Sequence, residues 1–267
     1  MPIFDLQNVC FDYERVPALR GLLLCIEAGE RVALLGANGS GKSTLLRLLD
    51  ALYFPSQGAI SYCGQPLTPQ ALHQDGFALS FRRQVALLFQ NPDVQLFNPT
   101  VFDEVAFGPL QMGWPHEQVL AKVNATLDWM GIAHLRERPP YRLSGGEKKR
   151  VALASVVVLD PDVLLLDEPT STLDPRSQSQ IIDLIQQWKG SSKTVITATH
   201  QLEIVEDIAD RIVVLEEGRV AASGTPAEVL ANHELLLRAN LVHAHRHSHG
   251  TYVHSHPHLH SHAKHEH

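Results

Sequence analysis

A glycine-rich segment has the residue types and spacing of a phosphate-binding loop. Residues 36–43 read Gly-Ala-Asn-Gly-Ser-Gly-Lys-Ser and match the pattern G-x-x-x-x-G-K-[ST]. In this pattern backbone N–H groups surround nucleotide phosphates, the lysine contacts the terminal phosphates, and the last hydroxyl binds Mg²⁺. The residues expected to hold the nucleotide are Gly36, Asn38, Gly39, Ser40, Gly41, Lys42, Ser43 and Thr44, with Ser43 also on the metal.

A second segment, Leu143-Ser-Gly-Gly-Glu147, places small residues where a helix is expected to begin. Ser144 and Glu147 have the spacing of a capping box, so the serine could simply cap that helix. Gly145 and Gly146 also leave the backbone open, and a helix amino terminus with free N–H groups favours an anion. Taken together with residues 36–43, Ser144, Gly145 and Gly146 narrow the prediction from nucleotide binding in general to one type of ATPase.

Two carboxylates follow an apolar strand expected at residues 163–166. Asp167 is placed to hold Mg²⁺ through water, as the second acidic element of P-loop NTPases does. Glu168 could then polarise the attacking water as general base. The alternative is an ordinary acidic turn after a strand, but the phosphate-binding loop favours catalysis.

Two further residues, His200 and Asp174, could also contact the nucleotide. His200 ends a strand expected at residues 194–199. A lone histidine there is usually structural, but its place downstream of the two carboxylates favours contact with the γ-phosphate. Asp174 precedes Pro175 and should cap a helix, while remaining available to the nucleotide site.

The surrounding pattern predicts an α/β fold. Short strands are expected in residues 1–35 and a helical pattern in residues 95–158. The other predicted elements are a helix at residues 44–49, strands at 31–35, 84–89, 163–167, 194–199 and 211–215, a helix near 177–188, and a last helix opened by Thr225. Strand, glycine loop and helix in this order form the setting that the loop motif requires.

Composition excludes several classes of protein. The chain has 22 Lys and Arg against 29 Asp and Glu, a net charge of −7, which does not suggest a nucleic-acid binder. Its three cysteines are irregularly spaced and predict free thiols in a reducing compartment. We expect no signal peptide and no apolar run long enough to span a bilayer, so another chain should supply any membrane component.

Over residues 3–240 these motifs make the chain resemble an ABC-type ATPase subunit. The resemblance implies a P-loop (RecA-like) core with an N-terminal antiparallel β subdomain and an inserted helical subdomain, about residues 95–158. It implies that the Lys42 loop and the 143–147 segment bind one ATP from opposite subunits of a dimer. It also implies that Tyr13 stacks on adenine and that Gln90 senses Mg²⁺ and links the site to a membrane partner.

A narrower resemblance, to the energy-coupling-factor branch, is carried by residues 90–97, which contain P-D-x-Q, and by residues 105–110. It implies docking of a transmembrane coupling protein beside a substrate-binding membrane component, with the ATPase peripheral at the cytoplasmic face of the membrane. An ordinary polar loop and helix cap is the alternative. Gln201 follows His200 at a position where many members of this family have aspartate. The geometry beside His200 is therefore not given by the resemblance.

The carboxyl-terminal segment, residues 241–267, forms a separate unit from the ATPase domain, residues 1–240, by composition. Eleven of the sixteen histidines lie within residues 243–267 and largely alternate with other residues. Neutral imidazole suits Ni²⁺, Co²⁺ and Zn²⁺, and this composition predicts disorder without metal. The candidate ligands are His243, His245, His247, His249, His254, His256, His258, His260 and His262. A merely polar or pH-responsive tail is the alternative.

The function expected from these observations is ATP hydrolysis that powers import of cobalt or nickel through membrane proteins. The alternatives are an ABC ATPase for another solute, such as a vitamin, and a soluble metal-storage or metal-delivery NTPase. No [NT]-K-x-D guanine-reading motif is present, and the 143–147 segment would have no role in a soluble GTPase.

Overall fold

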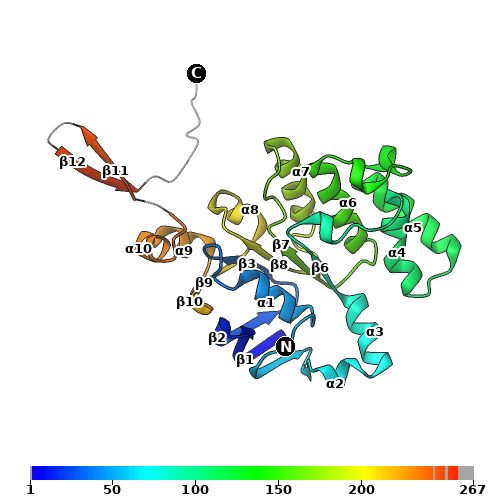
Figure 1. The fold of residues 1–267 in the computed structure, drawn as a ribbon, viewed down its shortest axis with the longest axis horizontal. Helices are drawn as coiled ribbons and strands as arrows, with labels where there is room; N and C mark the ends of the chain where they lie inside the picture. Colours follow the sequence, from blue (N-terminus) through cyan, green and yellow to red (C-terminus); the bar gives the residue numbers. More distant parts are fainter. Residues whose placement is uncertain (1, 243, 250–251, 258–267) are drawn as a thin grey trace.

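Two β-sheets of different type organise the chain in the computed structural model, which describes residues 2–242, 244–249 and 252–257. The larger sheet has the order β10-β9-β3-β8-β7-β6, and β10 alone is antiparallel to its neighbour. Its strands are β3 (Arg31–Leu35), β6 (Val85–Leu88), β7 (Val163–Asp167), β8 (Thr194–Thr199), β9 (Arg211–Glu216) and β10 (Arg219–Gly224). Helices cover both faces of this sheet (Figure 1). Its central strands β3, β7 and β8 are buried along their whole length, as expected for parallel strands covered on both faces.

The smaller sheet is antiparallel, with the order β2-β1-β4-β5. Its strands are β1 (Pro2–Tyr13), β2 (Val16–Glu27), β4 (Gln57–Tyr62) and β5 (Gln65–Pro66). The prediction of short strands in residues 1–35 is wrong for β1 and β2, which are each 12 residues long. Register shifts along this pair, beside Asn8 at φ 51°, let the strands continue through residues that break the alternation.

Helix α1 (Lys42–Leu49) lies between the two sheets, since its leucines share one core with residues of both. A second core lies between the other face of the large sheet and the helices of residues 95–158. Those helices are α4 (Val101–Gln111), α5 (His116–Trp129) and α6 (Gly145–Val157). The carboxyl-terminal half adds α7 (Pro175–Gln186), α8 (Val205–Ile208), α9 (Pro226–Ala231) and α10 (His233–Arg238).

Helices α2 (Pro69–Leu72) and α3 (Asp75–Gln84) were not predicted from the sequence, and neither were the short helices α8 and α10. Phe81 anchors α3, because its ring is fully buried and lies 5.2 Å from the ring of Tyr62 in the small sheet. At the other side of α3, Arg82 donates to the backbone oxygen of Asp50 at 2.6 Å. The helix therefore depends on contacts distant in sequence, which local periodicity does not reveal.

The buried carboxyl of Asp50, at the end of α1, should make stability depend on pH. Burial raises its pKa to about 7, and the neighbouring Arg82 only partly opposes this. Because the folded pKa lies above the unfolded value, the wild-type chain loses stability as pH rises from about 4 to about 7. Relative to Asp50→Asn, we expect the wild-type free energy of unfolding to fall by about 1–3 kcal/mol between pH 5 and pH 8.

Urea unfolding at the two pH values measures this difference. Asp160→Asn is the matched control, since that carboxylate is 70% exposed and pairs with Lys193 at the surface. Parallel pH profiles for the wild type and Asp50→Asn would contradict the assignment.

The described part of the histidine-rich segment forms an antiparallel pair, β11 (Ala244–His249) and β12 (Tyr252–Pro257). It hydrogen-bonds to neither of the other sheets. Disorder of this segment without metal stays a prediction; a two-residue alternation of side chains is also compatible with an extended, paired backbone. The predicted ligands outside the described residues are His243, His258, His260 and His262.

Candidate active site

The loop between β3 and α1 is packed so closely that two of its three glycines have no room for a side chain. A Cβ on Gly36 would lie 2.4 Å from the Ser40 hydroxyl, and one on Gly41 would lie 2.7 Å from Leu19. Gly39 has φ +83° and nothing within 4 Å of its Cβ position, so the loop is open on that side. The glycine spacing thus forms a backbone cradle of the kind that surrounds phosphates.

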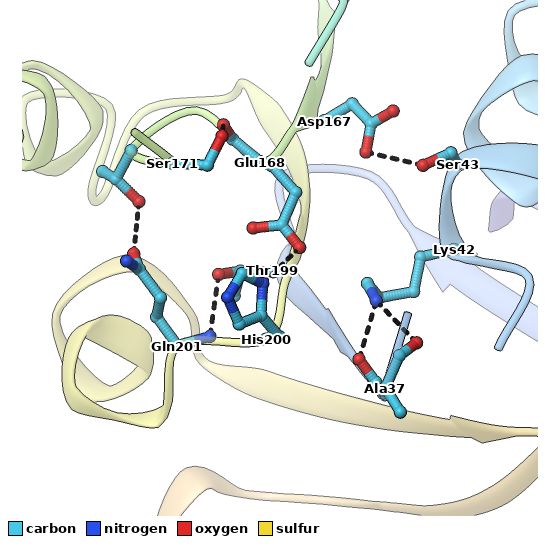
Figure 2. Close-up of polar contacts among 11 residues, drawn as sticks. Ala37, Lys42, Ser43, Asp167, Glu168, Ser171, Thr199, His200 and Gln201 are labelled. Carbon is cyan, nitrogen blue, oxygen red and sulfur yellow. Dashed lines mark hydrogen bonds and ion pairs between the residues drawn. The ribbon is translucent and has the colours of Figure 1, made fainter. Parts of the chain in front are cut away.

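Lys42 begins α1 and places its ammonium group inside this cradle (Figure 2). Its Nζ donates to the backbone oxygens of Gly36 at 2.7 Å and Ala37 at 3.1 Å. Burial lowers the pKa of this ammonium group, and the carboxylates of Glu168 and Asp167 partly oppose that effect. The loop therefore holds a buried cation, which a terminal phosphate can neutralise.

Ser43 and Asp167 meet next to the lysine, as Figure 2 shows. The Ser43 hydroxyl donates to Asp167 Oδ1 at 2.9 Å. Burial raises the pKa of Asp167, and the hydrogen bond from Ser43 lowers it. A hydroxyl and a carboxylate form the hard oxygen set that suits Mg²⁺, so these residues fit the expected metal.

Glu168 and His200 come from the ends of the neighbouring strands β7 and β8 and point toward one another (Figure 2). His200 Nδ1 lies 2.8 Å from Glu168 Oε1. Glu168 is 4% exposed, its φ is +45°, and its buried Oε2 has no hydrogen-bond partner among the residues that the structure describes. A buried orphan oxygen on a left-handed backbone is strain of the kind retained at functional sites.

One cavity of about 520 Å³ gathers most of the predicted nucleotide residues. The predicted residues lining it are Tyr13, Asn38, Gly39, Gly41, Lys42, Ser43, Thr44, Gln90 and Glu168. Tyr13 is 36% exposed, and its hydroxyl contacts Thr44 at 3.2 Å and Arg47 at 3.1 Å. The tyrosine therefore lies at the border of the cavity with an accessible ring. Its stacking on adenine stays a prediction.

The Ser144 segment does not line this cavity. Ser144 and Glu147 form the predicted capping box at the start of α6, with the Ser144 backbone N–H donating to Glu147 Oε2 at 2.8 Å. A Cβ on Gly146 would meet the Ser177 hydroxyl at 2.6 Å, so the starts of α6 and α7 lie side by side. Asp174 caps α7 through Ser177, as predicted. Contact of Ser144, Gly145, Gly146 and Asp174 with nucleotide stays a prediction.

Gln201, the departure noted in the sequence, ties together the loops that follow β7 and β8. The hydroxyl of Thr170 donates to Gln201 Oε1 at 2.6 Å, and the backbone N–H of Gln201 donates to the Thr199 hydroxyl at 3.1 Å. Thr170 and Thr199 are both fully buried. Glutamine thus has a defined role beside Glu168 and His200.

The sequence reasoning missed Lys149, a buried lysine close to the site. It lies on α6 and donates to the backbone oxygen of Gln90 at 2.7 Å. The run Lys148-Lys149-Arg150 reads as a solvated face, but successive helical residues are turned by about 100°. One residue of a three-residue charged run on a helix can therefore point inward. The run itself was the sequence feature that could have indicated a buried lysine.

Comparisons with known proteins agree with this geometry. The family model described as ABC transporter matches residues 19–171. The chain is 56% identical to the nickel import ATP-binding protein NikO of Rhodobacter capsulatus, over 90% of this chain and 96% of that protein. It is 43% identical to the energy-coupling factor transporter ATP-binding protein EcfA2 of Methanospirillum hungatei, over 90% of this chain and 60% of that protein.

Among solved structures, the chain is similar to cbiO1 from Clostridium perfringens, described as part of the ABC transporter complex cbiONQ. The TM-score is 0.75 and the identity 38%, over 90% of this chain and 95% of that one. The fold, the glycine cradle and the carboxylate at the end of β7 have the arrangement of an ATP-hydrolysing cassette. The chain therefore belongs to the ABC transporter family, as an importer-type ATPase similar to a nickel import ATPase, to cbiO1 and to energy-coupling-factor ATPases.

Proposed function

We propose that this chain hydrolyses ATP to power import of nickel or cobalt through membrane proteins. The observation that carries this cargo is the similarity to a nickel import ATPase over nearly the whole of both chains. The histidine-rich segment at residues 243–267 supports the same cargo independently, because imidazole suits these ions.

The site residues have separate roles in this proposal. Mg²⁺, held by Ser43, Gln90 and water on Asp167, would neutralise phosphate charge when bound. Lys42 binds the terminal phosphates, and Glu168 accepts the proton of the attacking water through its unpaired Oε2. His200 uses Nδ1 on Glu168, so Nε2 is the ring nitrogen left for the γ-phosphate.

Two copies of the chain are needed for a complete site. The Ser144 helix terminus lies outside the cavity that contains Lys42, although its free N–H groups suit a phosphate. We infer that Ser144, Gly145 and Gly146 of one subunit close over ATP held by the other, with Asp174 at the same interface. ATP binding then stabilises the dimer, and hydrolysis at Glu168 releases it.

An exposed apolar surface follows Gln90 and suits a membrane partner. Phe97 is 67% exposed, and its ring packs edge-on against Phe107 with centroids 5.0 Å apart. Val94 and Leu110 are exposed in the same two segments. In the described part of the chain, no helix is long and apolar enough to cross a bilayer. We infer that this surface docks a transmembrane coupling protein beside a substrate-binding membrane component, at the cytoplasmic face.

Native co-purification tests this function. The chain is extracted gently from native membranes, the bound proteins are identified by mass spectrometry, and the recovered complex is reconstituted for ATP-driven uptake. Polytopic partners together with nickel or cobalt uptake support the proposal. Uptake of a vitamin without metal would contradict the metal cargo but keep the ATPase role. Absence of any membrane partner would favour the alternative of a soluble metal-handling protein.

The histidine-rich segment should bind metal independently of catalysis. The register of β11 and β12 places His245 opposite His256 and His247 opposite His254. Neutral imidazole binds transition-metal ions, and residues 243–267 contain eleven histidines. Removing residues 243–267 should therefore abolish high-capacity Ni²⁺, Co²⁺ or Zn²⁺ binding while basal ATPase activity stays within about twofold, since the segment forms its own sheet.

Equilibrium dialysis with each metal and a phosphate-release assay measure the two properties. A variant with every histidine of residues 243–267 replaced by serine keeps the segment's length and is the matched control. Retained metal binding in both variants would contradict the assignment, and collapse of basal activity would make the segment structural.

A further inference from the structure

The loop after β6 is fastened to helix α6 from within the protein. Gln95 bridges the two: its Oε1 accepts from the Phe89 backbone N–H at 3.2 Å, and its Nε2 donates to the Ala152 backbone oxygen at 2.9 Å. The same Nε2 also donates to the Ser155 hydroxyl at 3.0 Å. The amide of Gln95 thus serves as donor to the helix and acceptor from the loop, which a carboxylate could not do.

Lys149 makes a second link between the same elements. Its side chain is 1% exposed, and Nζ donates to the backbone oxygens of Gln90 at 2.7 Å and Phe89 at 3.2 Å. Lys149, Ala152 and Ser155 are spaced by three residues, so they lie along one face of α6. A buried ammonium group is costly unless it is hydrogen-bonded, so its partners are specified strongly.

The hydrogen bonds of Gln95 and Lys149 connect the nucleotide cavity to the amino terminus of α6. Gln90, at one end, lines the cavity of the chain's own nucleotide. Ser144, at the other end, starts the helix that carries Lys149, about 6–8 Å away at 1.5 Å per residue. A 190 Å³ cavity between them is lined by both Gln90 and Gly145, so the two segments face each other closely.

We propose that Lys149 and Gln95 are positioning residues that make the Gln90 loop and α6 move as one unit. The position of the Gln90 loop then determines whether the helix terminus at Ser144 can reach the ATP bound by the partner subunit. This assignment rests on the proposed nucleotide-bridged dimer. Neither Lys149 nor Gln95 lines the nucleotide cavity, and both act through the backbone atoms to which they are hydrogen-bonded.

The neighbouring Lys148 provides a matched control. Its Nζ lies 2.6 Å from Asp93 Oδ1, on the same loop, but the two side chains are 19% and 62% exposed. Because the Asp93 carboxylate is largely solvated, water screens this ion pair and its net contribution to stability is small. Removing Lys148 deletes the same charge one residue away while leaving the buried links intact.

The test measures ATP-driven dimerisation of the full chain carrying Glu168→Gln, a change chosen to block hydrolysis. Sedimentation gives the ATP concentration at half-maximal dimer, and a fluorescent ATP analogue gives the affinity of the monomer at low protein concentration. We expect Lys149→Met and Gln95→Glu to raise the ATP concentration needed for dimerisation about tenfold or more, with monomer affinity unchanged. Lys149→Arg and Lys148→Met should stay within about twofold of the parent.

Other outcomes overturn the proposal. Unchanged dimerisation in both Lys149→Met and Gln95→Glu would remove the positioning role. Equal loss in Lys148→Met would assign the effect to net charge. A fall in monomer affinity and thermal stability that parallels the dimerisation change would make the links merely structural. Failure of the Glu168→Gln parent itself to dimerise with ATP would instead refute the proposed dimer, so the two failures are distinguishable.

Discussion

Replacing Glu168 by glutamine is expected to reduce ATP turnover by on the order of 10²- to 10⁴-fold, the usual contribution of a general base. Glutamine keeps the size and the oxygen that faces His200, but it cannot accept the proton of the attacking water. The buried, unpaired Oε2 on a strained backbone is the reason to place this role on Glu168. ATP binding should be retained, because the glycine cradle and Lys42 are untouched.

Phosphate release measures turnover, and direct binding of labelled ATP measures affinity. With hydrolysis blocked, ATP should accumulate in a stable dimer that gel filtration resolves. Glu203→Gln is the control, since this exposed carboxylate follows β8 but does not line the nucleotide cavity. Near-normal turnover of Glu168→Gln would remove Glu168 from the catalytic role.

The site elements that follow a local pattern could be predicted from the sequence. The Lys42 loop needs glycines at fixed spacing between a strand and a helix, and this requirement is visible in eight consecutive residues. The capping box at Ser144 and the cap at Asp174 depend on contacts three residues apart, and both were predicted. Each of these features is stabilised by residues close together in the sequence, so a short sequence pattern is enough to predict it.

Features that depend on distant contacts were not predictable in this way. Helix α3 is stabilised by burial of Phe81 against the small sheet, and nothing near Phe81 in the sequence indicates that partner. The inward direction of Lys149 depends on where the Gln90 loop passes, about sixty residues earlier, because the loop carbonyls are its acceptors. A charged run has the same composition whether or not one member is buried.

Replacing Lys42 by alanine should weaken ATP binding itself, by on the order of 100-fold, because a desolvated ammonium–phosphate contact is worth several times an exposed one. This effect differs from that of Glu168→Gln, where binding persists and turnover is lost. Titration with a fluorescent ATP analogue in the presence of Mg²⁺ measures the affinity. Lys189→Ala, which removes an exposed lysine outside the nucleotide cavity, should bind ATP like the wild type.

The stability of Lys42→Ala distinguishes a binding role from a structural one. Burial lowers the pKa of Lys42, which means that the folded chain without ligand holds this charge at a cost. Its hydrogen bonds to the Gly36 and Ala37 oxygens offset only part of that cost. The free energy of unfolding at pH 7 should therefore change by no more than about 1 kcal/mol in the variant. A large loss of stability would instead assign Lys42 to holding the loop together, whereas lost affinity with retained stability means that the lysine is kept buried for the phosphate.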